Sequence, residues 1–131
     1  MIDVEADVFS AVYPSVAPLV PYGCFKSMYV PRPPAFPFST LMEVSNRTAT
    51  RQRGTATLEE YAVLTYEANV YAQDKLTCRR VMNVLDTAMI KLNFTRVSLQ
   101  FIPNLADSSL FRYTARYTAA VDTNKRIFRH T

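Results

Sequence analysis

The chain has 131 residues and a formal net charge of +4, and 49% of its residues are hydrophobic, which suits one domain around a single core. Its two glycines, Gly23 and Gly54, are too few to write a dinucleotide-binding glycine motif or a phosphate-binding P-loop. Two cysteines and one histidine cannot complete a structural zinc site without ligands from elsewhere. We therefore expect no cofactor and no metal.

The N-terminus and the cysteines predict a soluble, non-secreted protein that is made in a reducing compartment. The opening MIDVEAD is acidic, where a signal peptide would be basic, and no apolar run approaches membrane-spanning length. Cys78 falls among apolar residues at helical spacing, which favours a buried thiol over a disulfide with Cys24. We expect no contact with a membrane.

The first part of the chain predicts one short helix and one strand. Residues 2–13 place apolar residues on one helical face and acidic residues in the first turns, where they suit the helix dipole. Because proline disrupts a helix interior, we expect an extended connector to follow, broken by Pro14, Pro18 and Pro21. Residues 24–30 then read as a strand, and the proline-rich segment 31–37 as a stiff bend.

Residues 46–57 separate a strand expected at 38–45 from a strand expected at 60–71. They contain no large apolar side chain and carry three arginines, Arg47, Arg51 and Arg53. Loops of this length without structure of their own are uncommon unless they have a function. We interpret 46–57 as an extended exposed loop that docks on a partner or touches nucleic acid, and a mobile solvated loop is an equally open alternative.

The clearest pattern is an amphipathic helix over Asp74–Phe94. Its apolar residues recur at spacings of three and four and share one face: Cys78, Val81, Met82, Leu85, Ala88, Met89 and Leu92. Asp74 is the expected N-cap, and Asn93 is expected to take the left-handed conformation at the C-terminal end. A helix with one apolar face has to pack on another element, and the flanking strands are the natural candidates.

The last third of the chain predicts three strands. The first covers 96–102, and the second, at 110–121, alternates an apolar face with a polar face that contains Arg112, Thr114, Arg116 and Thr118. A turn at 122–125 leads to a short strand at 126–129. We predict the order α-β-β-β-α-β-β-β in a single α+β domain over 1–131, with a mixed or antiparallel sheet, the long helix on one face and a short N-terminal helix.

The sequence does not predict an enzyme. His130, the single histidine, stands one residue from the end of the chain, where chains fray, and any nucleophilic site would depend on it. Glu67 lies inside an apolar strand, which fits an interface salt bridge as well as an acid–base role. The polar face that includes Arg112 and Arg116 is either a solvated sheet face or a subunit interface.

A series of motifs fills residues 64–129. A strand ending in EANVYAQDK leads to the helix VMNVLDTAMIKLNFTR, the link IPNLAD, and a hairpin with Arg112, Arg116-Tyr117, Val121-Asp122 and Ile127-Phe128-Arg129. These motifs resemble those of the tail terminator (tail completion) proteins of long-tailed bacteriophages, which are small α/β proteins encoded among head–tail joining genes. Asn93 stands where glycine is common in that family.

The resemblance implies a structural virion protein of the tail and neck, assembled in the host cytoplasm. Such proteins form a homo-oligomeric ring, usually of six copies, that caps the head-proximal end of the tail tube, stops its polymerisation and joins it to the head connector. DNA would pass through the ring without sequence recognition. The residues expected to contact subunits or the tube are Arg47, Arg51, Arg53, Glu67, Arg112 and Arg116.

Two other functions stay open. The alternative among virion proteins is a head-completion, connector or other minor tail protein. A small nucleic-acid-binding module would rest only on the net positive charge and the arginines of 46–57.

Overall fold

The computed structural model describes residues 1–20, 24–25, 37–53, 56–103 and 110–129, with the backbone alone for 24–25, 48–53 and 56–60. The elements follow the predicted order: α1 (Glu5–Val16), a 3₁₀ turn η1 (Ala17–Leu19), β1 (Cys24–Phe25), β2 (Phe38–Arg53), β3 (Ala56–Ala72), α2 (Lys75–Lys91), β4 (Thr95–Pro103), β5 (Phe111–Asp122) and β6 (Ile127–Arg129). The predicted α+β class is confirmed.

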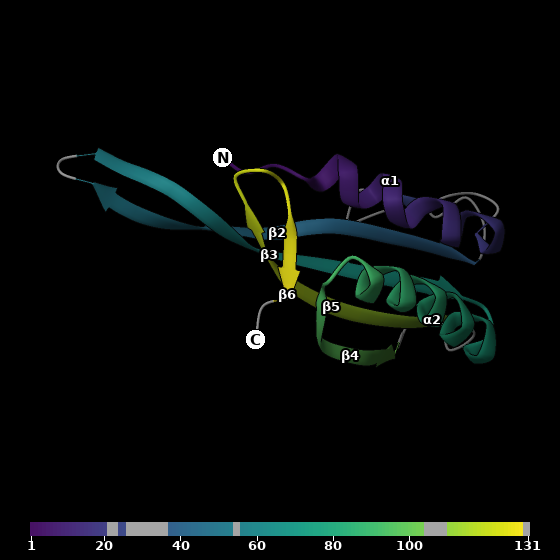
Figure 1. Cartoon of the computed structure of the whole chain (residues 1–131). Helices are drawn as coiled ribbons and strands as arrows, with labels where there is room; N and C mark the ends of the chain where they lie inside the picture. Colours follow the sequence, from purple (N-terminus) through teal and green to yellow (C-terminus); the bar gives the residue numbers. More distant parts are fainter. Residues whose placement is uncertain (21–23, 26–36, 54–55, 104–109, 130–131) are drawn as a thin grey trace.

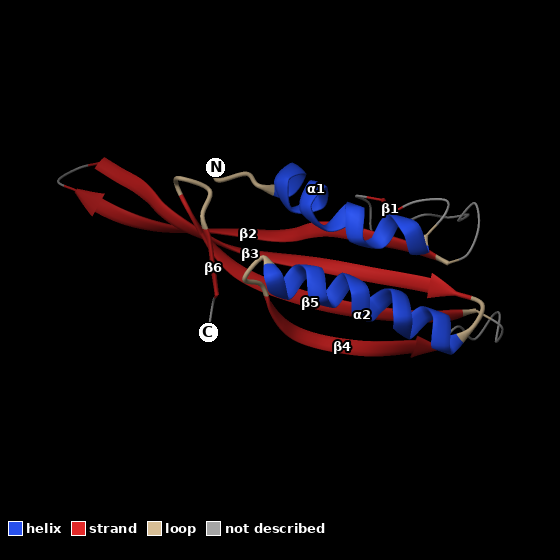
Figure 2. Ribbon diagram, turned by 45° about the vertical axis from the view of Figure 1, so that its right-hand side comes forward, coloured by secondary structure: helices blue, strands red, loops and turns tan. Residues whose placement is uncertain are grey.

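The strands form one sheet in the order β1-β2-β3-β5-β4, and β6 pairs with β5. The short β1 is parallel to β2, while the other pairs are antiparallel, so the sheet is mixed. Both helices lie on the same side of the sheet (Figures 1 and 2). α1 lies over β2 and beside α2, which lies over β3 and β5.

Helix α2 begins and ends as its sequence predicts. The Asp74 carboxylate accepts hydrogen bonds from the Thr77 backbone N–H at 3.0 Å and from its hydroxyl at 2.8 Å, and these bonds lower the pKa of Asp74. At the other end Asn93 has a φ of 71°, and the Phe94 N–H donates to the Met89 carbonyl at 3.2 Å. This turn buries Phe94 against the edge of the Tyr66 ring, 5.2 Å between centroids.

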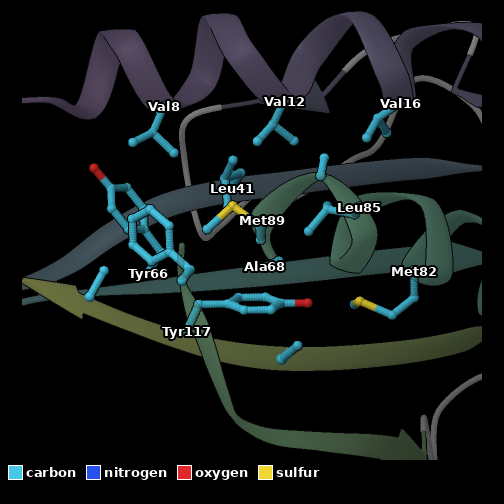
Figure 3. Packing of buried hydrophobic residues seen from close by; sticks show 14 of the residues in the cluster. Val8, Val12, Val16, Leu41, Tyr66, Ala68, Met82, Leu85, Met89 and Tyr117 are labelled. Carbon is cyan, nitrogen blue, oxygen red and sulfur yellow. The ribbon is translucent and has the colours of Figure 1, made fainter. Parts of the chain in front are cut away.

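The core lies between the two helices and the sheet (Figure 3). The predicted face of α2 is buried from Cys78 to Met89, and α1 contributes a row of valines at intervals of four: Val8, Val12 and Val16. On the sheet, the residues that pack against the helices include Leu41, Ala68, Tyr66 and Tyr117. The sheet side under the helices therefore carries the apolar half of each alternating strand.

The N-terminal helix begins and ends three residues later than expected, at Glu5–Val16 instead of 2–13. Pro14 was expected to break it, but α1 continues through Pro14 to Val16. A proline inside a helix removes one backbone hydrogen bond. Continuing the helix places the fully buried Val16 one turn beyond Val12, and this packing explains why the helix does not stop.

The prediction that residues 46–57 form a loop is wrong. Residues 46–53 continue β2 and residues 56–57 begin β3, with Arg47 opposite Val63 and Arg53 opposite Ala56. Residues 46–57 show no apolar alternation, so the sequence lacked the usual strand signal here. Of the strand expected at 24–30, Cys24–Phe25 is confirmed as β1; residues 26–36 and 104–109 lie outside the described residues.

Candidate assembly surfaces

A two-stranded arm leaves the sheet at the end of β2 and the start of β3. The β3–β5 ladder begins at Tyr61, opposite Asp122, whereas the β2–β3 ladder continues to Arg53 and Ala56. Residues 50–53 therefore pair only with residues 56–59, Glu60 is the extra residue at the register shift, and we call 50–53 and 56–60 the arm. Figure 1 shows the hairpin extending well beyond the helices. A register shift between Ala49 and Thr50 marks the junction.

The predicted arginines divide between the arm and the sheet. Arg51 and Arg53 belong to the arm by their backbone positions, opposite Leu58 and Ala56. Arg47 lies in β2 before the arm begins, and its side chain is exposed. The structure thus places all three arginines on β2, with Arg51 and Arg53 in the projecting arm and Arg47 in the body of the sheet.

The sheet side away from the helices carries a polar face across β3 and β5. The ladder places Glu67 opposite Arg116, Asn69 opposite Thr114 and Tyr71 opposite Arg112. The opposite side of β5 buries Ala115, Tyr117, Ala119 and Val121, so the alternation predicted for this strand is confirmed. We use "polar face" for Glu67, Asn69, Tyr71, Arg112, Thr114 and Arg116.

Side chains of the polar face interact within the chain. Arg112 donates to Asn69 Oδ1 from Nε at 3.1 Å and from Nη2 at 2.8 Å, and its guanidinium lies 5.5 Å from the centre of the Tyr71 ring. Burial raises the pKa of Tyr71, and the Arg112 cation opposes that effect. The structure therefore holds Arg112 in a fixed geometry on this face.

Glu67 forms the second group on the polar face. The residue is 8% exposed, and its carboxylate accepts a hydrogen bond from the Thr114 hydroxyl at 3.2 Å and pairs with Arg116 Nε at 3.8 Å. Glu67 thus forms a salt bridge within the chain, between β3 and β5, whereas a salt bridge across an interface stays a prediction. Arg116 keeps more than half of its side chain exposed. It is the member of the pair that remains available to a partner.

Two buried polar atoms on the polar side of the sheet have no partner among the described residues. They are Asn69 Nδ2 and Thr40 Oγ1, and the β2–β3 register places Thr40 directly opposite Asn69. Leaving a buried donor unpaired costs free energy. The polar face therefore retains hydrogen-bonding capacity beside Arg112.

The edge strand β4 presents a surface that the sequence analysis missed. Its alternating apolar residues are exposed: Val97 by 63%, Leu99 by 41% and Phe101 by 43%. Leu99 and Phe101 pair with the helix-side residues Ala115 and Tyr113, but α2 does not cover them. A groove between α2 and β4 is lined by Arg79, Met82, Asn83, Leu99 and Tyr113. Alternation indicated two faces, but only the strand order shows that β4 is an edge.

Metal ligands, membrane-spanning helices and reactive side chains are the other features that could indicate a function. The part of the chain that the structure describes holds no cluster of three His, Cys, Asp or Glu residues able to bind a metal ion, and none of its helices is long and apolar enough to cross a membrane. Cys78 is a free, buried thiol, as expected. Its Sγ donates to the Val70 carbonyl at 3.2 Å, and burial raises the pKa of the thiol to about 11. His130 lies outside the described residues.

Comparison with known proteins finds similarity only at the level of structure. No family model and no curated protein matches the sequence. Fourteen chains of solved structures match the fold. One belongs to the virion of a native gene transfer agent (GTA) particle; it is 17% identical, with a TM-score of 0.52, over 86% of this chain and 92% of that chain. The two chains share a fold.

Proposed function

We propose that this chain is a structural virion protein, and specifically a tail terminator. It forms a homo-oligomeric ring, of six copies by analogy with the resembling family, on the head-proximal end of the tail tube. The ring ends tube polymerisation and joins the tail to the head-completion or connector protein. It acts without catalysis, within the tail and neck of the virion, after assembly in the host cytoplasm, and DNA passes through it without sequence recognition.

The main support is the fold shared with a chain of the gene transfer agent virion. That similarity extends over 92% of the other chain, so it concerns a whole subunit rather than one recurring motif. The resemblance of residues 64–129 to tail terminators came from different features, namely the turns and the hairpin pattern. The two observations agree on a virion protein, and the terminator role rests on the sequence resemblance.

The geometry of the chain suits a ring. A ring needs heterologous contacts, in which two different surfaces of each subunit meet. The arm projects from one end of the sheet, whereas the polar face and the edge strand β4 lie on the body. One copy therefore offers a projecting element and separate surfaces that can receive it.

The deciding experiment is polymerisation of the tail tube protein from the same genome, with and without the purified chain. We expect tubes of limited length with the chain at one end only, seen by negative-stain electron microscopy, and ring-sized oligomers by native mass spectrometry. Unchanged tube length would contradict the terminator role. Binding to DNA-filled heads under those conditions would favour the head-completion alternative.

A nucleic-acid-binding module is the candidate from another class, and the arginines of the hairpin are the observation that favours it. Such binding would weaken steeply as salt is raised. Loss of DNA binding on replacing Arg47, Arg51 and Arg53 by Gln, without any effect on tubes, would replace our proposal with that function.

A further inference from the structure

Among the described residues, the outer edge of β4 and both outer edges of the arm have no neighbour in the sheet, as do the outer edges of the short strands β1 and β6. β4 pairs only with β5, so its outer edge is free. Between the register shift at Arg96/Ser98 and Pro103 this edge runs without interruption over residues 98–102. In the arm, residues 56–60 of β3 pair with β2 alone, so their outer edge is free as well. Free edges offer unpaired backbone groups to another strand.

The outer edge of β2 differs, because the start of α1 covers it. The Glu5 carboxylate accepts the Glu43 backbone N–H at 3.1 Å, and Asn46 Nδ2 donates to the Ile2 carbonyl at 2.9 Å. A side chain thus already satisfies the backbone at the middle of this edge. In the described part of the sheet body, β4 offers the longest free edge, because β1 has only two residues and β6 only three.

The surroundings of β4 are apolar and positively charged. Leu99 and Phe101 are exposed on the helix side, and Lys75 Nζ lies 5.8 Å from the centre of the Phe101 ring. Arg79, one turn after Lys75, lines the groove beside Leu99, and no acidic partner of Arg79 occurs in the described part of the chain. A strand that docks here needs an apolar residue and carboxylates.

The arm has one strand of that composition and one that lacks it. Residues 56–60 read Ala-Thr-Leu-Glu-Glu, so Leu58 adjoins Glu59 and Glu60. Residues 50–53 read Thr-Arg-Gln-Arg, and their two cations would be repelled by Lys75 and Arg79. Charge therefore selects the β3 strand of the arm.

We propose that residues 56–60 of one copy add as a strand to the free edge of β4 in the next copy, which places the acidic pair Glu59 and Glu60 next to Lys75 and Arg79. The proposal rests on the ring proposed above and names its subunit contact. Five residues on each side give a paired length of about 16 Å. Backbone hydrogen bonds supply the affinity, and the charges select the strand.

The contact joins two different surfaces of the same chain. Each copy presents its arm to one neighbour and its β4 edge to the other, as a closed ring requires. The arm lies outside the sheet, so adding it to β4 of another copy breaks none of the β3–β5 pairs within its own copy.

The test compares two neighbouring arginines of α2. We expect Arg79→Glu to weaken ring formation at least tenfold, measured by native mass spectrometry across a concentration series and by capping of tubes. Arg80→Glu is the matched control, because Arg80 has the same charge and is exposed on the same helix but does not line the groove beside Leu99. Circular dichroism checks that both variants fold.

A charge swap identifies the segment that docks. Adding Glu59→Lys and Glu60→Lys to Arg79→Glu is expected to restore assembly. If Arg79→Glu and Arg80→Glu assemble equally well, or if the swap restores nothing while the unaltered chain forms rings, the proposed contact is wrong and the ring function stands. If the unaltered chain forms no ring in solution or on tubes, the proposed function and this contact both fail.

Discussion

The Tyr117 hydroxyl donates a 2.8 Å hydrogen bond to Asp86 Oδ1, and Arg96 Nη1 lies 3.4 Å from the same oxygen. One carboxylate on α2 therefore ties the helix to β5 and to β4. Burial raises the pKa of Tyr117, and the hydrogen bond to Asp86 raises it further, so the phenol remains a donor throughout the physiological range. Asp86, Tyr117 and Arg96 thus join α2 to β5 and to β4, the strand with the proposed docking edge.

Replacing Tyr117 by Phe is expected to lower the free energy of unfolding by about 1.5 to 3 kcal/mol, because a hydrogen bond to a charged group is lost from a buried position. The measurement is urea unfolding followed by circular dichroism. Tyr113→Phe is the matched control on the same face of β5, since its ring is half-buried and no hydrogen bond of its hydroxyl is observed. Equal effects of the two variants would contradict the prediction.

Stability should depend on pH through Glu43. Burial raises the pKa of this carboxyl above its ordinary value of 4.5, although the hydrogen bond from Tyr66 partly opposes the effect. The folded state therefore holds the proton more tightly than the unfolded chain, and the resulting stabilisation is full below pH 4.5 and is lost as the pH rises through the folded pKa.

The side chain of residue 43 cannot ionise in the Glu43→Gln variant, so this variant does not lose that stabilisation as the pH rises. We expect the unfolding free energy of the unaltered chain, relative to this variant, to fall between about pH 4 and about pH 7. Urea unfolding of both proteins at the two pH values checks the sign. A relative stability that stays constant or rises with pH would show that burial does not control this carboxyl.

The two arginines of the polar face should differ in their effect on stability. Arg112→Ala leaves the buried Asn69 carbonyl oxygen without its donors and is expected to cost about 1 to 3 kcal/mol. Arg116→Ala removes a longer ion pair whose arginine is more than half exposed, and the Thr114 hydroxyl still donates to Glu67, so this change is expected to cost less than about 1 kcal/mol. Thermal and urea unfolding of both variants test the order, and a reversed order would contradict the assignment.

Shortening the arm should separate folding from assembly. Deleting residues from β2 alone would leave β3 without its partner, since Arg47 pairs with Val63. Replacing residues 50–60 by Asn-Gly instead joins the facing pair Ala49 and Tyr61 by a two-residue turn that suits a hairpin. We expect urea unfolding close to that of the unaltered chain, and no rings by native mass spectrometry.

The control for the arm keeps its length and changes its charge, with Arg51→Gln and Arg53→Gln in the full-length chain. Because the proposed contact uses the other strand of the arm, these two changes are expected to leave rings intact. Rings formed by the shortened chain would exclude the arm from the assembly interface.

Much of the fold could be predicted because its elements carry local signals. The spacing of apolar residues, the Asp74 cap and the Asn93 turn define α2, and strict alternation defines β5. Each signal depends on residues a few positions apart, whose contacts follow from helix or strand geometry alone. The interpretation of 46–57 as a loop was wrong because these residues have no apolar period, and only the pairing of β2 with β3 shows that they form strands.

The candidate surfaces depended on contacts between distant residues. Glu67 and Arg116 were each chosen from the sequence, but the β3–β5 register makes them partners. Likewise, the alternation in β4 did not show that Leu99 and Phe101 would be exposed, because exposure depends on strand order and on how far α2 extends over the sheet. The sequence by itself determined which residues share a face of each element. Only the tertiary structure decided which faces meet and which edges remain free, because those depend on pairing between segments far apart in the chain.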